Sequence, residues 1–177
     1  LGPPHAKGPT VCEQADRVRR CSARPPLFMS SPGVGQTRDV AAARPAEETE
    51  RFAERHRLAG FDAMKAAELA STGSDYGASG YTTLGQVETL ATQLPLGPGD
   101  LLLDLGSGTG WPGLHLAELT GCRVVVTDPV GEGPEAARTR ARADGIADRV
   151  SAVPADGRAV PFRSGSVDAL VHSDALC

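Results

Sequence analysis

The stretch LLLDLGSGTG, residues 101–110, carries the strongest signal in the chain. Its first five residues have the pattern of a short buried strand, and Gly106, Gly108 and Gly110 follow at alternate positions. A strand that ends in glycines and leads into a helix lets the backbone approach a ligand closely, because no Cβ intervenes and the helix N-terminus presents free N–H groups. Asp104 adds a negative charge beside the loop, which indicates a ligand with a positive end rather than phosphate alone.

Short apolar runs alternate with helical patterns from residue 101 onward. Such alternation predicts a Rossmann-like, doubly wound α/β fold, with a parallel sheet that carries helices on both faces. Ligands of such sheets bind beyond the carboxyl ends of the strands. The strands are expected over residues 101–105, 123–127, 150–153 and 167–171, and the helices over Trp111–Leu119, with Pro112 in its first turn, and Pro134–Asp144.

Three zones are expected along the chain. Residues 1–45 are rich in Pro, Gly, Ala, Arg and Ser without apolar periodicity, so we expect a disordered tail. Residues 46–95 form a helical segment that is interrupted by a loop over 71–81, after which Thr83 and Gln86 have the spacing of a capping box. Residues 96–177 form the ligand-binding α/β domain.

Composition narrows the classes of function. Residues 1–45 carry seven Lys or Arg and three Asp or Glu, whereas the remainder carries eleven and nineteen, and such an acidic body disfavours nucleic acid as a partner. An apolar run of roughly 18 residues, long enough to span a bilayer, is absent, and so is a signal-peptide pattern. The four cysteines contain no CxxC pair, so we expect free thiols, no metal site and a cytoplasmic location.

Two ligand classes compete for the glycine-rich loop. Asp128 follows the second strand, 24 residues after Asp104, where a carboxylate accepts hydrogen bonds from the two hydroxyls of a ribose. This position supports a nucleoside in either class. The segment GTGWPG, residues 108–113, also matches the GxGxxG pattern of NAD(P)-dependent oxidoreductases, although that loop has no need of Asp104. Asp156 follows the third strand, where its carboxylate can accept from an adenine amino group.

Residues 101–110, Asp128, Asp156 and the segment VPFRSGSVDALVHSD resemble the successive motifs of class I S-adenosylmethionine-dependent methyltransferases, of the methyltransferase type 11 kind. The resemblance covers about Gly80 to Cys177. It implies that the chain binds S-adenosyl-L-methionine and methylates a small-molecule acceptor. The resemblance also implies which residues contact each part of the cofactor. Asp104 binds the ammonium group of the methionine, and the loop under the cofactor consists of Gly106, Ser107, Gly108 and Gly110. Asp128 binds the ribose, the adenine lies against Pro129 or Val130 and Asp156 with Gly157, and the methyl group lies near His172 and Ser173.

For several other side chains, the sequence allows both a role at the site and a purely structural role. His172 is the candidate general base, although a histidine after a strand also serves as a structural or cofactor-lining residue. In similar methyltransferases the N-terminal segment covers the cofactor, so Tyr81 or Tyr76 is expected over the methyl group or, alternatively, packed on the domain. Trp111 is expected to pack under the loop, and His56 and His115 are expected to be solvated or already paired.

Seven strands make a complete fold of this class, whereas the chain ends about six residues after the fourth expected strand. The sequence therefore predicts an incomplete domain with low turnover by itself. The alternatives are an NAD(P)-dependent oxidoreductase that uses residues 108–113 and a cofactor-binding fragment without catalysis.

Overall fold

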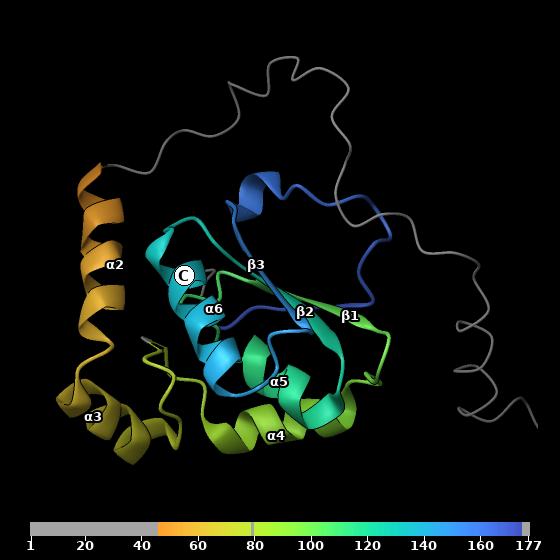
Figure 1. Cartoon of the computed structure of the whole chain (residues 1–177), viewed down its shortest axis with the longest axis horizontal. Coiled ribbons are helices and arrows are strands. Elements are labelled where there is room, and N and C mark those ends of the chain that lie inside the picture. The colour runs from red at the N-terminus through yellow and green to blue at the C-terminus, as the bar shows by residue number, and fades with distance from the viewer. Residues whose placement is uncertain (1–45, 79, 175–177) are drawn as a thin grey trace, which may run out of the picture.

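A four-stranded parallel sheet lies at the centre of the computed structural model, which describes residues 46–78 and 80–174 (Figure 1). The strand order is β3-β2-β1-β4, so the chain returns to the other side of β1 for its last strand. This reversal is the hallmark of the doubly wound, Rossmann-like fold, and the expected fold class is confirmed. The strands are β1 (Leu101–Leu105), β2 (Arg123–Asp128), β3 (Val150–Pro154) and β4 (Ala169–Val171).

Three helices pack on one face of the sheet, namely α4 (Leu84–Gln93), α5 (Gly113–Thr120) and α6 (Glu132–Ala143). The main core lies between them and the sheet, with Leu102 and Val126 of the strands packed among Val87, Leu114 and Ala137 of the helices. The expectation of helices on both faces is wrong for the described residues. The opposite face, with Leu101, Leu103 and Val125, is covered by Phe162 and Val167 from the segment that follows the short 3-10 helix η1 (Gly157–Ala159).

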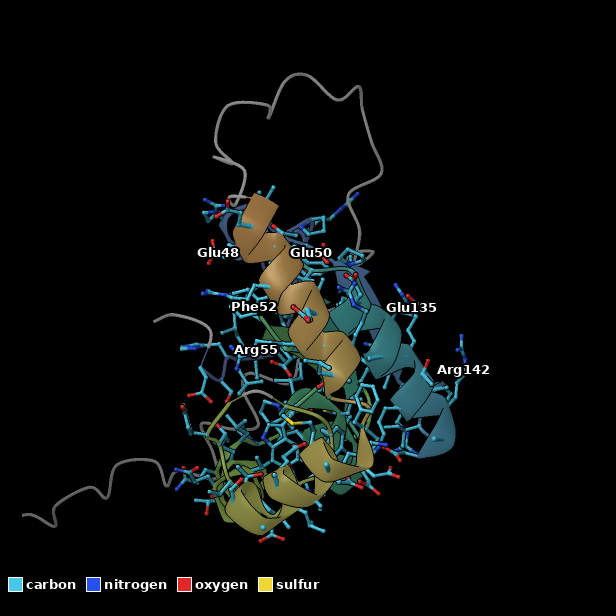
Figure 2. All side chains as sticks on the ribbon, turned by 90° about the vertical axis from the view of Figure 1, so that its left-hand side faces the viewer. Glu48, Glu50, Phe52, Arg55, Glu135 and Arg142 are labelled. Carbon is cyan, nitrogen blue, oxygen red and sulfur yellow. The ribbon has the colours of Figure 1, made fainter. Side chains whose placement is uncertain are left out.

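Two further helices precede this domain, α2 (Ala46–Leu58) and α3 (Asp62–Thr72). Helix α2 lies beside α6, as both views of the chain show (Figures 1 and 2). Helix α3 ends at Gly73, whose φ of 80° gives the left-handed turn that stops a helix. None of the helices within residues 46–78 and 80–174 is long and apolar enough to cross a membrane. The tail predicted to be disordered, residues 1–45, lies outside the described residues.

Several element boundaries differ from the expected ones for local reasons. Helix α5 starts at Gly113 rather than at residue 111, with Pro112 as its N-cap, because the Gly113 N–H is bound by the Asp104 carboxylate. Strand β4 is shorter than expected because only its residues 169–171 pair with β1. The capping box of Thr83 and Gln86 at the start of α4 is confirmed, with both reciprocal hydrogen bonds present.

We predict that Leu102→Ala lowers the free energy of unfolding by about 2–5 kcal/mol, because it leaves a cavity in the middle of the core. Leu102 is fully buried on the central strand, whereas Leu170 on β4 is 51% exposed. Leu170→Ala is therefore the matched control, with an expected loss of less than about 1 kcal/mol. Urea unfolding of both variants measures the difference, and equal losses would contradict the assigned core.

Candidate functional site

The loop after β1 reverses its direction through three glycines with positive φ, at 70° for Gly106, 53° for Gly108 and 106° for Gly110. A Cβ on Gly110 would also lie 2.6 Å from a Leu114 side-chain atom, so no other residue fits there without movement. Ser107 is buried, and its N–H donates to the Thr127 carbonyl at 2.9 Å. Ser107 thus anchors the loop to the end of β2.

Asp104 lies fully buried under the loop, at the end of β1. Its Oδ2 accepts a hydrogen bond from the Gly113 N–H at 2.8 Å, whereas its Oδ1 is buried with no hydrogen-bond partner among the described residues. Burial raises the pKa of Asp104 to about 8, with a smaller contribution from the Asp128 charge and an opposing one from the Gly113 hydrogen bond. A buried acceptor of this kind matches a positively charged hydrogen-bond donor.

Asp128, at the end of β2, holds the loop from the other side. Its Oδ2 accepts from the Gly108 N–H at 3.0 Å, and its Oδ1 accepts from the Val130 N–H at 2.8 Å. Each carboxylate oxygen has a further lone pair, so these bonds orient the group and leave acceptor capacity for ribose hydroxyls. Pro129 is partly exposed beside it, and Val130 is buried. The structure therefore brings Asp104, the glycine loop and Asp128 together at one edge of the sheet.

Asp156 is already engaged in a local ion pair. Its carboxylate accepts from the Arg158 N–H at 2.9 Å and from the Arg158 guanidinium, with Nη2 at 2.6 Å. It thereby caps the short helix η1. Gly157 lies against Leu105 at the end of β1, because a Cβ on Gly157 would be 3.3 Å from both methyl groups of that leucine. The adenine contact expected of Asp156 and Gly157 stays a prediction.

The end of β4 is bound to the segment that precedes α4. Asp174 Oδ2 accepts from the Tyr81 N–H at 2.8 Å, and Ser173 shares a short hydrogen bond with the Thr82 hydroxyl. His172 is exposed, and its proposed role as a base stays a prediction. Tyr81 contributes its backbone here, since its side chain is 86% exposed. The contact of Tyr81 with a cofactor likewise stays a prediction.

Tyr76 packs on the domain, which was one of the two expected positions for its ring. Its ring lies 5.0 Å from that of Trp111 and 4.1 Å from the Arg140 guanidinium. Trp111 is buried, as expected, and its Nε1 donates to the Thr82 carbonyl at 3.0 Å. His115 is paired with Glu118 at 3.1 Å.

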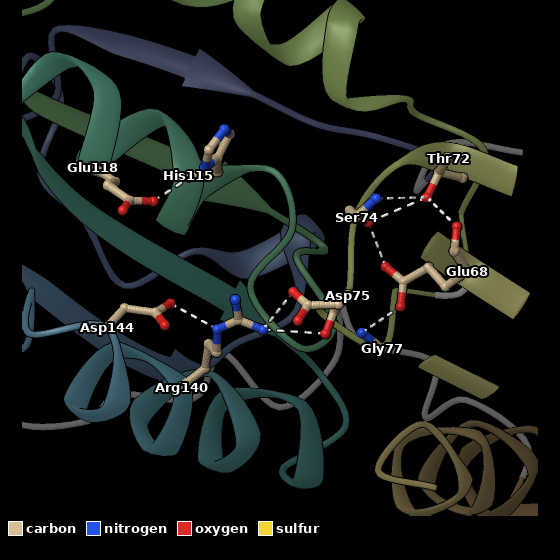
Figure 3. A network of polar contacts seen from close by, with 9 residues as sticks. All are labelled: Glu68, Thr72, Ser74, Asp75, Gly77, His115, Glu118, Arg140 and Asp144. Carbon is tan, nitrogen blue, oxygen red and sulfur yellow. Dashed lines mark hydrogen bonds and ion pairs between the residues drawn. The ribbon is translucent and has the colours of Figure 1, made fainter. Parts of the chain in front are cut away.

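Two carboxylate contacts secure the Tyr76 segment (Figure 3). Glu68 of α3 accepts from the Ser74 hydroxyl at 2.5 Å and from the Gly77 N–H at 2.6 Å. On the other side, Arg140 of α6 binds the Asp75 carboxylate at 2.9 Å. The segment that leads to Thr82 and the end of β4 is therefore held between α3 and α6.

His56 of α2 is the residue that the sequence did not single out for the site. A Cβ built on Gly108 would lie 3.2 Å from the His56 Cε1, so the imidazole covers the glycine loop. Its Nε2 is buried and has no hydrogen-bond partner among the described residues, so the expectation that His56 is solvated or already paired is wrong. Burial lowers the pKa of His56, against the opposing effects of Asp128 and Glu132. No sequence spacing marks this residue, because its position depends on how α2 packs against α6.

This arrangement has the properties of a binding site for a nucleoside with a cationic end. The glycine loop is open to close approach, Asp128 offers acceptors at the end of β2, and the free oxygen of Asp104 lies buried between them. Within residues 46–78 and 80–174, no group of three His, Cys, Asp or Glu side chains is arranged to hold a metal ion.

Comparison with known protein families gives a match over this region. Residues 102–177 match the family model described as "Methyltransferase domain". The matched part begins in β1 and includes the glycine loop, Asp128 and the end of β4.

Several proteins that are similar to the chain are named as methyltransferases. The chain is 37% identical over 81 residues to the methyltransferase GfsG of Streptomyces halstedii, covering 46% of this chain and 29% of that protein. It is 33% identical over 88 residues to the sterol 24-C-methyltransferase of Eremothecium gossypii, covering 50% of this chain and 24% of that protein. A solved structure of geranyl diphosphate methyltransferase in complex with SAM is 29% identical, with a TM-score of 0.50, over 64% of this chain and 43% of that one. The chain thus spans less than half the length of each of these relatives.

We predict that Asp104→Asn changes how stability depends on pH. Because the pKa of Asp104 is raised from 3.8 to about 8 on folding, the native state retains a proton that the unfolded state releases between these values. The wild-type free energy of unfolding therefore falls through this window, by up to about 1.4 kcal/mol per pH unit, and the variant lacks that contribution. Urea unfolding at pH 5 and pH 8 should show the stability of the variant rising relative to wild type. A difference that is the same at both pH values would contradict the buried, protonated state of Asp104.

Proposed function

We propose that this protein is a class I S-adenosylmethionine-dependent methyltransferase that transfers the methyl group of S-adenosyl-L-methionine to a small molecule, because its residues 102–177 match a methyltransferase family model. The observation that carries the proposal is the buried, unpartnered Oδ1 of Asp104 beside three glycines with positive φ. S-Adenosylmethionine has an ammonium group that such an acceptor recognises, and a nucleoside that suits the glycine loop and Asp128.

We assign the parts of the cofactor to residues along the edge of the sheet. Asp104 binds the ammonium group, the backbone of residues 106–110 lies under the cofactor, and Asp128 accepts hydrogen bonds from the ribose hydroxyls. Pro129 or Val130, with Asp156 and Gly157, lines the adenine position. We assign residues 46–95 as a lid and substrate segment, and residues 96–177 as the cofactor-binding domain.

S-Adenosylmethionine supplies an electrophilic methyl group, which its sulfonium releases to a nucleophilic O, N, C or S atom. The chain's own contribution is mainly to hold the two reactants in line, because this displacement needs little acid–base chemistry. Where the acceptor is a hydroxyl or a carbon acid, a base accepts its proton. His172 at the end of β4 is our candidate for that role, since its side chain is exposed at the carboxyl edge of the sheet.

Charge and relatives support a small-molecule acceptor. Residues 46–177 carry eleven Lys or Arg and nineteen Asp or Glu, which disfavours the phosphate contacts of nucleic acid. Among the similar proteins, two are named for a sterol and for geranyl diphosphate as the molecules they methylate. We also propose a cytoplasmic location, in keeping with a free Cys122 and a sequence without CxxC pairs.

Contacts of Gly113 disfavour the nicotinamide-dependent alternative. In a dinucleotide-binding loop, the N–H groups at the start of the helix face the pyrophosphate. Here the Gly113 N–H at the start of α5 binds the Asp104 carboxylate, and a Cβ on Gly113 would lie 2.5 Å from Asp104 Oδ2. The last glycine of the GxGxxG pattern therefore makes room for the Asp104 carboxyl group, which occupies the N–H that a pyrophosphate would need.

We predict that the protein binds S-adenosylhomocysteine and does not bind NAD in calorimetric titrations. Asp104→Asn should weaken the binding of S-adenosylhomocysteine by at least tenfold, because a carboxyl group can lose its proton to pair with the ammonium group and an amide cannot. Asp148→Asn is the matched control with unchanged affinity, since Asp148 is an exposed aspartate next to Arg149.

Binding of NAD alone would overturn the proposal in favour of the oxidoreductase. Unchanged affinity of Asp104→Asn for S-adenosylhomocysteine would contradict the role of Asp104. Tight cofactor binding without methyl transfer to any acceptor, in a protein extended to the length of its relatives, would favour a non-catalytic binding domain.

A further inference from the structure

The imidazole of His56 covers the middle of the glycine loop, where a bound nucleoside is expected to pass. Its Cε1 lies 3.2 Å from the place that a Cβ on Gly108 would occupy. Gly108 is also the residue whose N–H binds Asp128 at 3.0 Å. His56 thus lies above the contact between the loop and the carboxylate that we assign to the ribose.

Helix α2 holds the imidazole there through contacts with α6. Arg57, the next residue, binds Glu132 at the start of α6 at 3.3 Å and Glu50 of α2 at 2.7 Å. Ala53, three residues before His56, is buried. The start of α6 in turn lies against the loop, since a Cβ on Gly133 would be 2.6 Å from the Gly108 carbonyl oxygen. His56, α6 and the loop therefore form one packed unit.

The polar edge of His56 has an unused hydrogen-bonding atom. The Nε2 is buried without a partner among the described residues, which is a costly state unless a ligand supplies one. The charged groups that influence the imidazole are Asp128 at the end of β2, Glu132 on α6 and Arg55 on α2. Burial outweighs the two carboxylates and lowers the pKa of His56, so the ring is neutral at pH 7.

We propose that His56 is a cofactor-contacting residue whose neutral imidazole allows the site to accept the cationic S-adenosylmethionine and whose protonated form discriminates against it. This inference rests on the proposed function. S-Adenosylmethionine carries one more positive charge than S-adenosylhomocysteine, at the sulfonium. A second positive charge on the imidazole above Gly108 repels that sulfonium and leaves the neutral thioether of the product unaffected.

The test is the ratio of the two affinities as a function of pH. Calorimetric titration of the protein with S-adenosylmethionine and with S-adenosylhomocysteine, at pH 7.5 and in steps down to the lowest pH at which circular dichroism shows the protein folded, gives both dissociation constants without an acceptor. In wild type, protonation of His56 should weaken the binding of S-adenosylmethionine relative to that of S-adenosylhomocysteine by about three- to tenfold, as expected for like charges within a partly buried site. In His56→Gln, which stays neutral at residue 56, the change of the ratio with pH should be smaller by this factor.

Comparing the two ligands separates this role from simple structural support by α2. A loosened helix α2 would lower the affinities for both ligands equally at every pH. The loss of a titrating charge at residue 56 would instead alter the ratio of the two affinities. Asp104 is present in both proteins, so any effect of its charge on the ratio is common to both. His115→Gln is the matched control, a histidine of α5 that is paired with Glu118 and should keep the wild-type pH dependence.

The titrations distinguish a failure of the proposed function from a failure of the role of His56. Failure of wild type to bind either ligand at pH 7.5 would overturn the proposed function and this inference with it. Binding of both ligands with a ratio that does not change with pH in wild type would overturn the role of His56 alone. The same change of the ratio with pH in His56→Gln as in wild type would also overturn it.

Discussion

The hydrogen bond between the Asp104 carboxylate and the Gly113 N–H is the constraint on which the site depends. It joins the end of β1 to the first residue of α5 at 2.8 Å, inside the protein, and thereby sets the span of the intervening loop. A helix N-terminus favours a nearby negative charge, which offsets part of the cost of burying the carboxyl group. The closeness of the two groups excludes any side chain at residue 113. One carboxyl oxygen is left for a ligand.

The central strands and the glycine loop were predictable from sequence because their causes are local. Continuous apolar runs specify strands that are buried on both faces, and glycines mark positions with positive φ. Asp104 and Asp128 follow from the same rule, since the carboxyl ends of parallel strands share one edge of the sheet. Likewise, the capping box at Thr83 needs only residues three positions apart. The start of α5 was misplaced by two residues, because the decisive hydrogen bond comes from β1.

The positions of His56 and Tyr76 were not predictable, because both depend on contacts between segments far apart in sequence. His56 belongs to a helix whose pattern gives no sign of what it covers, and its contact with Gly108 arises from the packing of α2 on α6. Tyr76 had two equal interpretations until the contacts of its ring with Trp111 and Arg140 decided between them. The ion pair of Asp156 with Arg158 was not predicted, although the two residues are only two positions apart in the sequence.

Glycine amide signals give the most direct test of the claim that the loop after β1 binds the cofactor. In a protein labelled with ¹⁵N-glycine, titration with S-adenosylhomocysteine should shift the resonances of Gly106, Gly108 and Gly110 in the loop, and of Gly157 beside Leu105. The resonance of Gly85, which is exposed in the first turn of α4 with no neighbour within 4 Å of where its Cβ would lie, should remain in place and serve as the internal reference. Shifts confined to glycines outside the loop, or saturation of binding without any shift in the loop, would contradict the account.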